Sequence, residues 1–219
     1  MPAPAVFFDL DGTLVDTTYL HTYAWWRALD DAGENQPMAA IHPLIGMGSS
    51  GILDRLVGRD DQAIDAAHGD CFERLHPLVR PLPGAADVLE RVVATGGRVV
   101  IVTSAKEKDL DALLRPLDRD RLISEVVHGG DVGNAKPAPD PFAVALERTG
   151  TDPVEALAVG DSVWDVKAAA KVGLGCIGLQ TGGIARADLD HAGAVAVYRD
   201  CPELLDQWSV GPFAALLGG

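Results

Sequence analysis

Six short apolar runs, separated by longer segments, constrain the fold of this chain more than any other feature of its sequence. The runs are residues 6–10, 98–103, 125–128, 157–160, 176–179 and 194–198. Because they are apolar on both faces, they are typical of strands buried in a parallel sheet. Helical patterns at 85–95, 140–149 and 165–172 alternate with them. This alternation predicts βαβ units and therefore an α/β fold with a doubly wound parallel sheet.

Residues 17 to about 80 interrupt the alternation, because they contain no convincing strand. Helical patterns occupy 18–32, 52–57 and 61–75, and the segment ends among prolines 77, 81 and 83. We therefore expect a core domain made of residues 1–16 and 82–219, with an inserted all-helical domain, the cap, at residues 17–81. Doubly wound sheets bind ligands beyond the carboxyl ends of their strands. An insertion that leaves the end of the first strand would cover that crevice.

Charge and composition exclude several classes of partner. The chain has 18 basic and 32 acidic residues, a formal net charge of −14, whereas nucleic-acid binding and adsorption to anionic membranes need a basic surface. No apolar run approaches the roughly 18 residues of a membrane span, and the N-terminus lacks the basic and apolar regions of a signal peptide. We expect a cytoplasmic protein without nucleic-acid or membrane partners, whose thiols Cys71, Cys176 and Cys201 stay reduced.

Reactive side chains follow four of the predicted strands, close to the point where each strand ends. They are Asp9 and Asp11 after the first, Thr103 and Ser104 after the second, Lys136 after the third, and Asp161 and Asp165 after the fourth. Because the carboxyl ends of parallel strands meet at one edge of a sheet, we expect all of these side chains to converge.

The expected cluster is suited to phosphate chemistry. Asp9 and Asp11 lie two positions apart, so their side chains point to the same side and can divide the work of nucleophile and general acid/base. Asp161 and Asp165 would add negative charge, and crowded carboxylates raise one another's pKa unless a hard divalent cation such as Mg²⁺ binds. Lys136 and a hydroxyl group opposite that site would form a pocket for a tetrahedral oxyanion.

These motifs together resemble those of the haloacid dehalogenase-like hydrolase superfamily. The matching segments are Asp9-Leu10-Asp11-Gly12-Thr13, Thr103-Ser104, Lys136-Pro137 and Gly160-Asp161-Ser162 with Asp165. The helical insertion resembles the superfamily's type-1 cap, and the group that contains phosphoglycolate phosphatase and β-phosphoglucomutase is the most similar. The resemblance implies a Rossmann-like core and a Mg²⁺-dependent enzyme that acts on a small phosphorylated metabolite.

The resemblance also implies a role for each motif residue. Asp9 would attack phosphorus and form an aspartyl-phosphate, and Asp11 would protonate the leaving oxygen and then deprotonate water. Thr103, a backbone N–H near Ser104, and Lys136 would bind the phosphoryl group. Asp161, the Asp9 carboxylate and the Asp11 carbonyl would hold Mg²⁺. Asp165 would be either a further ligand or a partner of the ligands.

Candidate residues in the cap are fewer. His21 lies ten residues after Asp11, where β-phosphoglucomutase-like proteins carry a histidine that contacts the acid/base aspartate; the alternative is an ordinary histidine on a helix face. Residues 46–51 read Gly-Met-Gly-Ser-Ser-Gly, but Pro43 precedes them and no strand does, so we interpret them as a loop between cap helices rather than a dinucleotide site. Ser49 and Ser50 in this loop are candidate substrate contacts. We assign the pair Trp25-Trp26 to the cap core.

The sequence therefore predicts a phosphatase that hydrolyses a small phosphate monoester, such as phosphoglycolate or a sugar phosphate. Asp11 argues against dehalogenation, which needs no second aspartate, and the absence of lysine from residues 17–80 argues against phosphonatase chemistry. A β-phosphoglucomutase-like mutase is the alternative, although Thr13 and the serines at 49 and 50 replace its valine and arginine. A phospho-accepting signalling domain of the receiver type is a further alternative that motif order and the cap disfavour.

Overall fold

The central element of the fold is a six-stranded sheet in which all neighbouring strands are parallel. The computed structural model describes residues 3–218. Its strands are β1 (Ala5–Phe8), β2 (Arg98–Val102), β3 (Ile123–Val127), β4 (Ala156–Gly160), β5 (Gly175–Leu179) and β6 (Ala196–Tyr198). Their order is β3-β2-β1-β4-β5-β6. The chain therefore winds outward in both directions from β1, and the predicted doubly wound α/β fold is confirmed.

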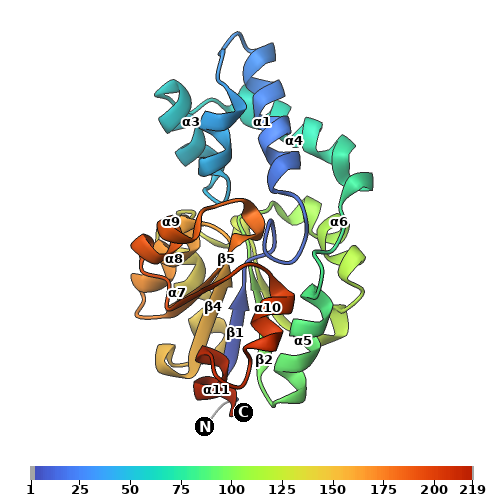
Figure 1. Cartoon of the computed structure of the whole chain (residues 1–219). Coiled ribbons are helices and arrows are strands. Elements are labelled where there is room, and N and C mark those ends of the chain that lie inside the picture. The colour runs from blue at the N-terminus through green and yellow to red at the C-terminus, as the bar shows by residue number, and fades with distance from the viewer. Residues whose placement is uncertain (1–2, 219) are drawn as a thin grey trace.

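Helices cover both faces of the sheet (Figure 1). The described residues form α1 (Thr18–Asp31), α2 (Met38–Ile41), α3 (Ser49–Val57), α4 (Gln62–Leu75), α5 (Ala85–Ala94), α6 (Leu110–Leu114), α7 (Asp140–Thr149), α8 (Val163–Ala170), α9 (Arg186–Ala192), α10 (Cys201–Asp206) and α11 (Pro212–Leu217). Apolar residues of α5, α6, α10 and α11 pack on one face, and those of α7, α8 and α9 pack on the other.

Strand β1 shows why the sheet is buried on both sides. Its residues alternate between the two apolar clusters, with Val6 and Phe8 in one and Ala5 and Phe7 in the other, and all four are fully buried. Burying a phenylalanine side chain contributes roughly 1.5–3 kcal/mol, so Phe7 and Phe8 stabilise the centre of the sheet. Asp9 follows directly, and its backbone N–H donates to the Val159 carbonyl of β4 at 2.9 Å.

The helices α1 to α4 form a separate layer above the carboxyl ends of the strands (Figure 1). They enclose an apolar cluster of their own that includes Trp25, Leu29, Ile41 and Leu53. One core residue, Trp164 of α8, joins that cluster, and its indole Nε1 donates to the carbonyl of Pro43 at 3.0 Å. Trp164 is therefore one contact between cap and core, and Ala24, Cys71 and Phe72 of the cap pack in turn against the apolar cluster of the core.

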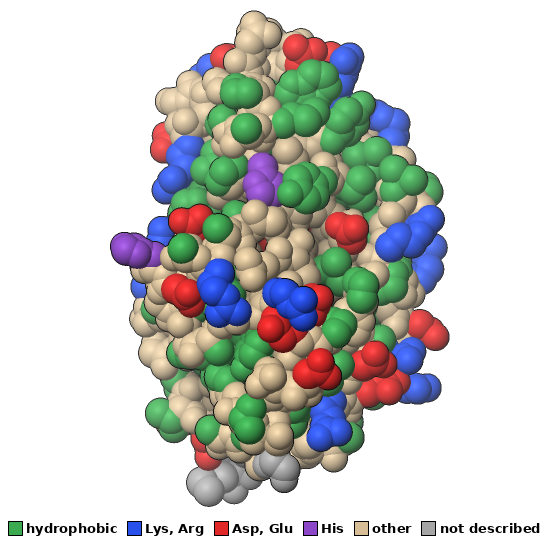
Figure 2. Space-filling model, in the orientation of Figure 1, with side chains coloured by type: hydrophobic (Ala, Val, Ile, Leu, Met, Phe, Trp, Pro, Cys, Tyr) green, Lys and Arg blue, Asp and Glu red, His purple; other side chains and the backbone are tan. Residues whose placement is uncertain are grey.

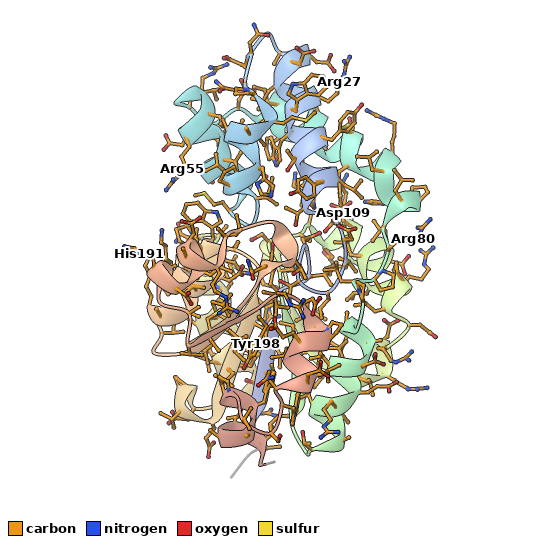
Figure 3. All side chains as sticks on the ribbon, in the orientation of Figure 1. Arg27, Arg55, Arg80, Asp109, His191 and Tyr198 are labelled. Carbon is orange, nitrogen blue, oxygen red and sulfur yellow. The ribbon has the colours of Figure 1, made fainter. Side chains whose placement is uncertain are left out.

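The two connections between cap and core run side by side. The backbone N–H of Asp16 donates to the Arg80 carbonyl at 2.9 Å, and that of Leu82 donates to the Leu14 carbonyl at 2.9 Å. The chain therefore enters and leaves the cap at one place, near the residue labelled Arg80 in Figure 3. This pairing supports our proposal that residues 17–81 are a unit distinct from the rest of the chain.

Several element boundaries differ from the sequence prediction. β1 ends at Phe8 rather than residue 10, and β3 spans Ile123–Val127 rather than 125–128. The helix predicted from residue 165 begins at Val163, because the Ser162 side chain caps it and Asp165 completes a capping box. The helix predicted from residue 52 begins at Ser49. The second half of the glycine-rich segment 46–51 is therefore helical rather than loop, since small polar residues suit a first helical turn.

The surface carries charges of both signs. On the face shown in Figure 2, Lys and Arg are interspersed with Asp and Glu over the core, and hydrophobic side chains are frequent over the cap. The thiols of Cys71, Cys176 and Cys201 are free and buried. Within residues 3–218, no helix has both the length and the apolar character that crossing a bilayer requires.

Candidate active site

A buried lysine connects two of the sequence-predicted aspartates. Lys136 Nζ lies 2.6 Å from Asp9 Oδ1 and 2.7 Å from Asp165 Oδ1. It also donates to the carbonyl of Val102, the last residue of β2, at 2.8 Å. The Lys136 side chain is only 1% exposed. The loop before α7 and the ends of β1, β2 and β4 thus meet at one point, as the parallel topology requires.

Three carboxylates lie around this point. Asp9, Asp161 and Asp165 each offer one oxygen, and these oxygens all lie within 4.8 Å of one another. Asp161 Oδ1 accepts a hydrogen bond from Thr13 Oγ1 at 2.9 Å. Asp165 Oδ2 accepts from the backbone N–H and the hydroxyl of Ser162, at 3.2 and 2.5 Å. Protein groups therefore contact both oxygens of Asp165, whereas Asp161 Oδ2 lies close to the backbone of Gly12 and Gly182.

Burial and like charge dominate the electrostatics of the cluster. Burial raises the pKa of Asp9 to about 7, against the effect of Lys136, and the nearby Asp165 and Asp11 add to the increase. Burial, Asp9 and Asp165 hold the pKa of Asp161 well above its usual value. Burial alone would lower the pKa of Lys136, but its two carboxylate partners outweigh burial and raise it. Lys136 is consequently always charged.

This composition fits a divalent cation. Three carboxylates and one ammonium group leave two negative charges unbalanced when all are ionised. The atoms that these carboxylates offer to a metal are oxygens, which Mg²⁺ prefers as ligands. Two glycines let the backbone pack directly against Asp161: a Cβ atom on Gly12 or Gly182 would lie 2.4 or 1.7 Å from its Oδ2. The backbone therefore approaches this carboxylate as closely as it can without side chains.

Asp11 has different neighbours. Its Oδ1 accepts from the Thr17 hydroxyl at 2.7 Å and lies 3.2 Å from His21 Nε2, and its Oδ2 accepts from Thr103 Oγ1 at 3.4 Å. Burial alone would raise the pKa of Asp11, but His21 and Thr17 outweigh burial and lower it. The Asp11 carboxyl group is not one of the three clustered carboxylates. The metal-binding group predicted for Asp11 is its backbone carbonyl, and this assignment stays a prediction.

A cavity of about 70 Å³ separates the cap from the core. Its core wall includes Asp9, Asp11, Ser104, Lys106 and Asp109, and its cap wall includes His21, Trp25, Ile45, Met47, Ser49, Ile52, His68 and Phe72. Asp109 lies between the cap helices and the core in Figure 3. Both catalytic candidates therefore face a pocket whose far wall is aromatic and apolar.

The predicted cap residues separate into those that line the cavity and one that does not. His21 and Ser49 line it, but Ser50 is exposed and lies outside it, because the two serines begin α3 and successive helical residues point about 100° apart. Trp25 belongs both to the cap core and to the cavity wall, so assigning it to the core alone was incomplete.

Other residues of the site carry no strong sequence signal. Thr13 belongs to the first motif, but its bond to Asp161 spans 148 positions. Thr17 is a hydroxyl six residues after Asp11. Gly182 and His68 belong to no recognisable motif, and only the folded chain brings them to the site.

A doubly wound sheet with a buried lysine and clustered carboxylates beneath a helical cap defines a capped α/β hydrolase of the phosphotransfer type. A family model described as haloacid dehalogenase-like hydrolase matches residues 3–173. The chain belongs to this family, and it is a phosphatase-type enzyme.

Known proteins agree with the assignment. A phosphoglycolate phosphatase from Rhodospirillum rubrum is 33% identical over 216 residues, which cover 92% of this chain and 89% of that protein. Among solved structures, a hydrolase from Pseudomonas syringae has a TM-score of 0.89 and 33% identity and covers 94% of this chain and 98% of its own. A protein from Bacteroides vulgatus, provisionally described as a β-phosphoglucomutase, has a TM-score of 0.87 and 25% identity, with coverage of 100% and 91%.

Proposed function

We propose that this enzyme hydrolyses a small organic phosphate monoester, of the phosphoglycolate or sugar-phosphate type, through an aspartyl-phosphate on Asp9. The observation that carries the proposal is the position of Asp9: it faces the cavity, with the Lys136 ammonium group 2.6 Å from its Oδ1. Such a lysine favours the ionised form of the carboxylate against the effect of burial on its pKa and balances charge on the phosphoryl group. Positioning and charge balance account for most catalysis of phosphoryl transfer.

The reaction has two balanced steps. An Asp9 oxygen bonds to phosphorus while the bond from phosphorus to the ester oxygen breaks, and Asp11, which takes up a proton from solvent or keeps the one gained in the previous turnover, gives that proton to the departing alkoxide. Water then attacks the phosphorus of the aspartyl-phosphate and gives a proton to Asp11, which releases inorganic phosphate and restores the Asp9 carboxylate. Asp11 suits both steps, since it lines the cavity and the contacts of His21 and Thr17 with its Oδ1 fix its position.

The remaining residues bind and orient. Thr103 and Ser104 follow β2, and backbone N–H groups in this loop, together with Lys136, would hold the phosphoryl oxygens. Asp165, whose oxygens contact Lys136 and Ser162, would orient the lysine rather than bind a metal. Ser49 would contact the leaving group from the cap.

Magnesium is the cofactor that this site would hold. The Asp9 and Asp161 carboxylates and the Asp11 backbone carbonyl would hold it, and when bound it supplies positive charge to the phosphoryl group. The unbalanced charge of the three buried, clustered carboxylates supports this assignment.

A phosphosugar mutase is the alternative, and the cavity wall favours hydrolysis. A mutase has to bind a second phosphate at the far end of its pocket. Among the described residues that line the cavity, Lys106 is the single lysine or arginine, and it already lies 2.8 Å from Asp65 Oδ2. The single cationic side chain among these described residues that could bind a second phosphate, Lys106, is therefore already paired with Asp65.

A panel of phosphorylated metabolites tests the proposal. Purified protein with Mg²⁺ should release phosphate from at least one small monoester, and Asp9→Asn should abolish the release while the fold is retained. Asp111→Asn, at an exposed helix position, is the matched control and should keep full activity. Substantial turnover by Asp9→Asn would remove Asp9 as the nucleophile.

A further inference from the structure

A second histidine stands behind the one that contacts Asp11. His68 Nε2 lies 3.2 Å from His21 Nδ1, and His21 Nε2 lies 3.2 Å from Asp11 Oδ1. The two histidines come from different cap helices, α1 and α4, and are 47 positions apart. The three side chains therefore form a continuous chain from the cap interior to the catalytic edge of the sheet.

Aromatic contacts fix both imidazole rings in place. His68 is 8% exposed and stacks on Trp25, with ring centroids 4.0 Å apart and planes 10° from parallel. His21 stacks on Phe72 at 3.8 Å and 19°. Neither ring can turn without disturbing these contacts, so the direction of each ring nitrogen is set by packing in the cap.

The hydrogen bonds then decide where the protons lie. The Asp11 carboxylate accepts, so His21 Nε2 carries a proton, and Nδ1 of the same ring is then the nitrogen that can accept from His68. Burial, His21 and the nearby lysines Lys106 and Lys108 hold the pKa of His68 well below its usual value, so His68 has one N–H. With that proton on His68 Nε2, each N–H in the series from His68 through His21 to Asp11 has an acceptor. The other tautomer would leave an N–H at His68 Nδ1, where the structure provides no partner.

We propose that His68 is a positioning residue for the acid step: its Nε2–H donates to His21 Nδ1 and thereby fixes the tautomer and orientation in which His21 donates to Asp11. Partners behind a reacting group commonly act in this way, and their loss costs about 10–100-fold at metal-bound histidines. The inference rests on the proposed function, because it requires Asp11 to be the acid that protonates the leaving group.

The proposal makes the effect of His68 depend on the leaving group. An alkoxide such as glycerol's needs a proton as it departs, whereas p-nitrophenolate departs without one. The ratio of kcat/KM for glycerol 3-phosphate to that for p-nitrophenyl phosphate therefore isolates the acid step, because kcat/KM covers the reaction up to release of the alcohol. If the substitution only disturbed the packing of the cap, it would lower kcat/KM for both substrates by the same factor.

Two substitutions separate the hydrogen bond from the packing. His68→Phe keeps a ring against Trp25 but removes the N–H, and we expect it to lower the kcat/KM ratio by about 10-fold. His68→Gln restores an amide N–H near the position of Nε2 and should recover most of the ratio. His191→Gln is the control, because this histidine is exposed on α9 (Figure 3) and is not among the residues that line the cavity of the site. It should leave the ratio unchanged.

Nitrogen NMR of the His21 ring gives a readout that does not need activity. In the unaltered protein the ¹⁵N shifts should show the proton on Nε2 and none on Nδ1, and in His68→Phe they should show a mixture of tautomers. Identical His21 shifts in both proteins, or an equal fall of kcat/KM for the two substrates, would overturn the proposal.

Asp11→Asn distinguishes a failure of this inference from a failure of the proposed function. If that variant loses glycerol 3-phosphate hydrolysis selectively and His68→Phe does not, only the positioning role of His68 is wrong. If Asp11→Asn shows no dependence on the leaving group, Asp11 is not the acid and both proposals fail.

Discussion

Replacing Lys136 by methionine should destabilise the protein far more than removing a surface lysine. The Lys136 ammonium group contacts two buried carboxylates, Asp9 at 2.6 Å and Asp165 at 2.7 Å, and the Val102 carbonyl at 2.8 Å. Methionine retains most of the apolar volume but leaves three clustered carboxylates without their one cation. Removing one partner of a buried ion pair costs about 3–5 kcal/mol, so we expect a loss of that size in the free energy of unfolding.

Urea unfolding followed by circular dichroism, with EDTA present, measures this loss directly. The matched control is Lys171→Met: Lys171 also donates to a carbonyl, that of Pro137 at 2.7 Å, but it is exposed. The control should lose less than about 0.5 kcal/mol. Adding Mg²⁺ should recover part of the Lys136→Met loss, because a cation in the cluster supplies the missing positive charge. A loss below about 1 kcal/mol for Lys136→Met would refute the reasoning, since buried, mutually repelling carboxylates could not tolerate it.

The remaining predictions concern the metal, the glycine beside it and the cap histidine. Treatment with EDTA should stop phosphate release and excess Mg²⁺ should restore it; turnover that is indifferent to chelation would contradict the metal assignment. Gly182→Ala places a methyl group 1.7 Å from Asp161 Oδ2, so a Mg²⁺ titration of activity should show weaker binding, by about 10-fold or more if the clash shifts a ligand. Gly133→Ala, whose added methyl group would meet only Asp140 Oδ2 at 3.7 Å, should bind as the unaltered protein does. Because the folded state lowers the pKa of His68, its contribution to stability is complete above the unfolded value of about 6.5 and is lost as the pH falls below it. His68→Gln should therefore lose less stability between pH 7.5 and 5 than the unaltered protein in urea titrations, and equal losses would contradict the burial of a neutral imidazole.

The sheet and the residues at its carboxyl edge could be predicted because few physical constraints determine them. Runs such as 98–103 are apolar on both faces, and parallel strands must place their carboxyl ends at one edge. Once these conditions hold, Asp9 and Lys136 have to meet although 127 positions separate them. The family resemblance added roles to residues that topology had already brought together.

The cap could be predicted only as a block of helices, because the contacts inside it depend on how those helices pack. His68 looks like any histidine on an amphipathic helix until α4 packs on α1 and brings it 3.2 Å from His21. Ser49 and Ser50 are equivalent in sequence, and only the start of α3 decides which one faces the cavity. Gly182 lies beyond every motif, and its importance appears only in the distance to Asp161.

Chemical trapping of the covalent intermediate tests the central claim most directly. Protein mixed with substrate and Mg²⁺ is quenched within the first turnover and treated with borohydride, which reduces an acyl phosphate to an alcohol, and its peptides are then examined by mass spectrometry. We expect Asp9 to be converted to homoserine, and no conversion when substrate is omitted. Conversion of a different carboxylate, or none at all while phosphate is being released, would contradict nucleophilic catalysis by Asp9.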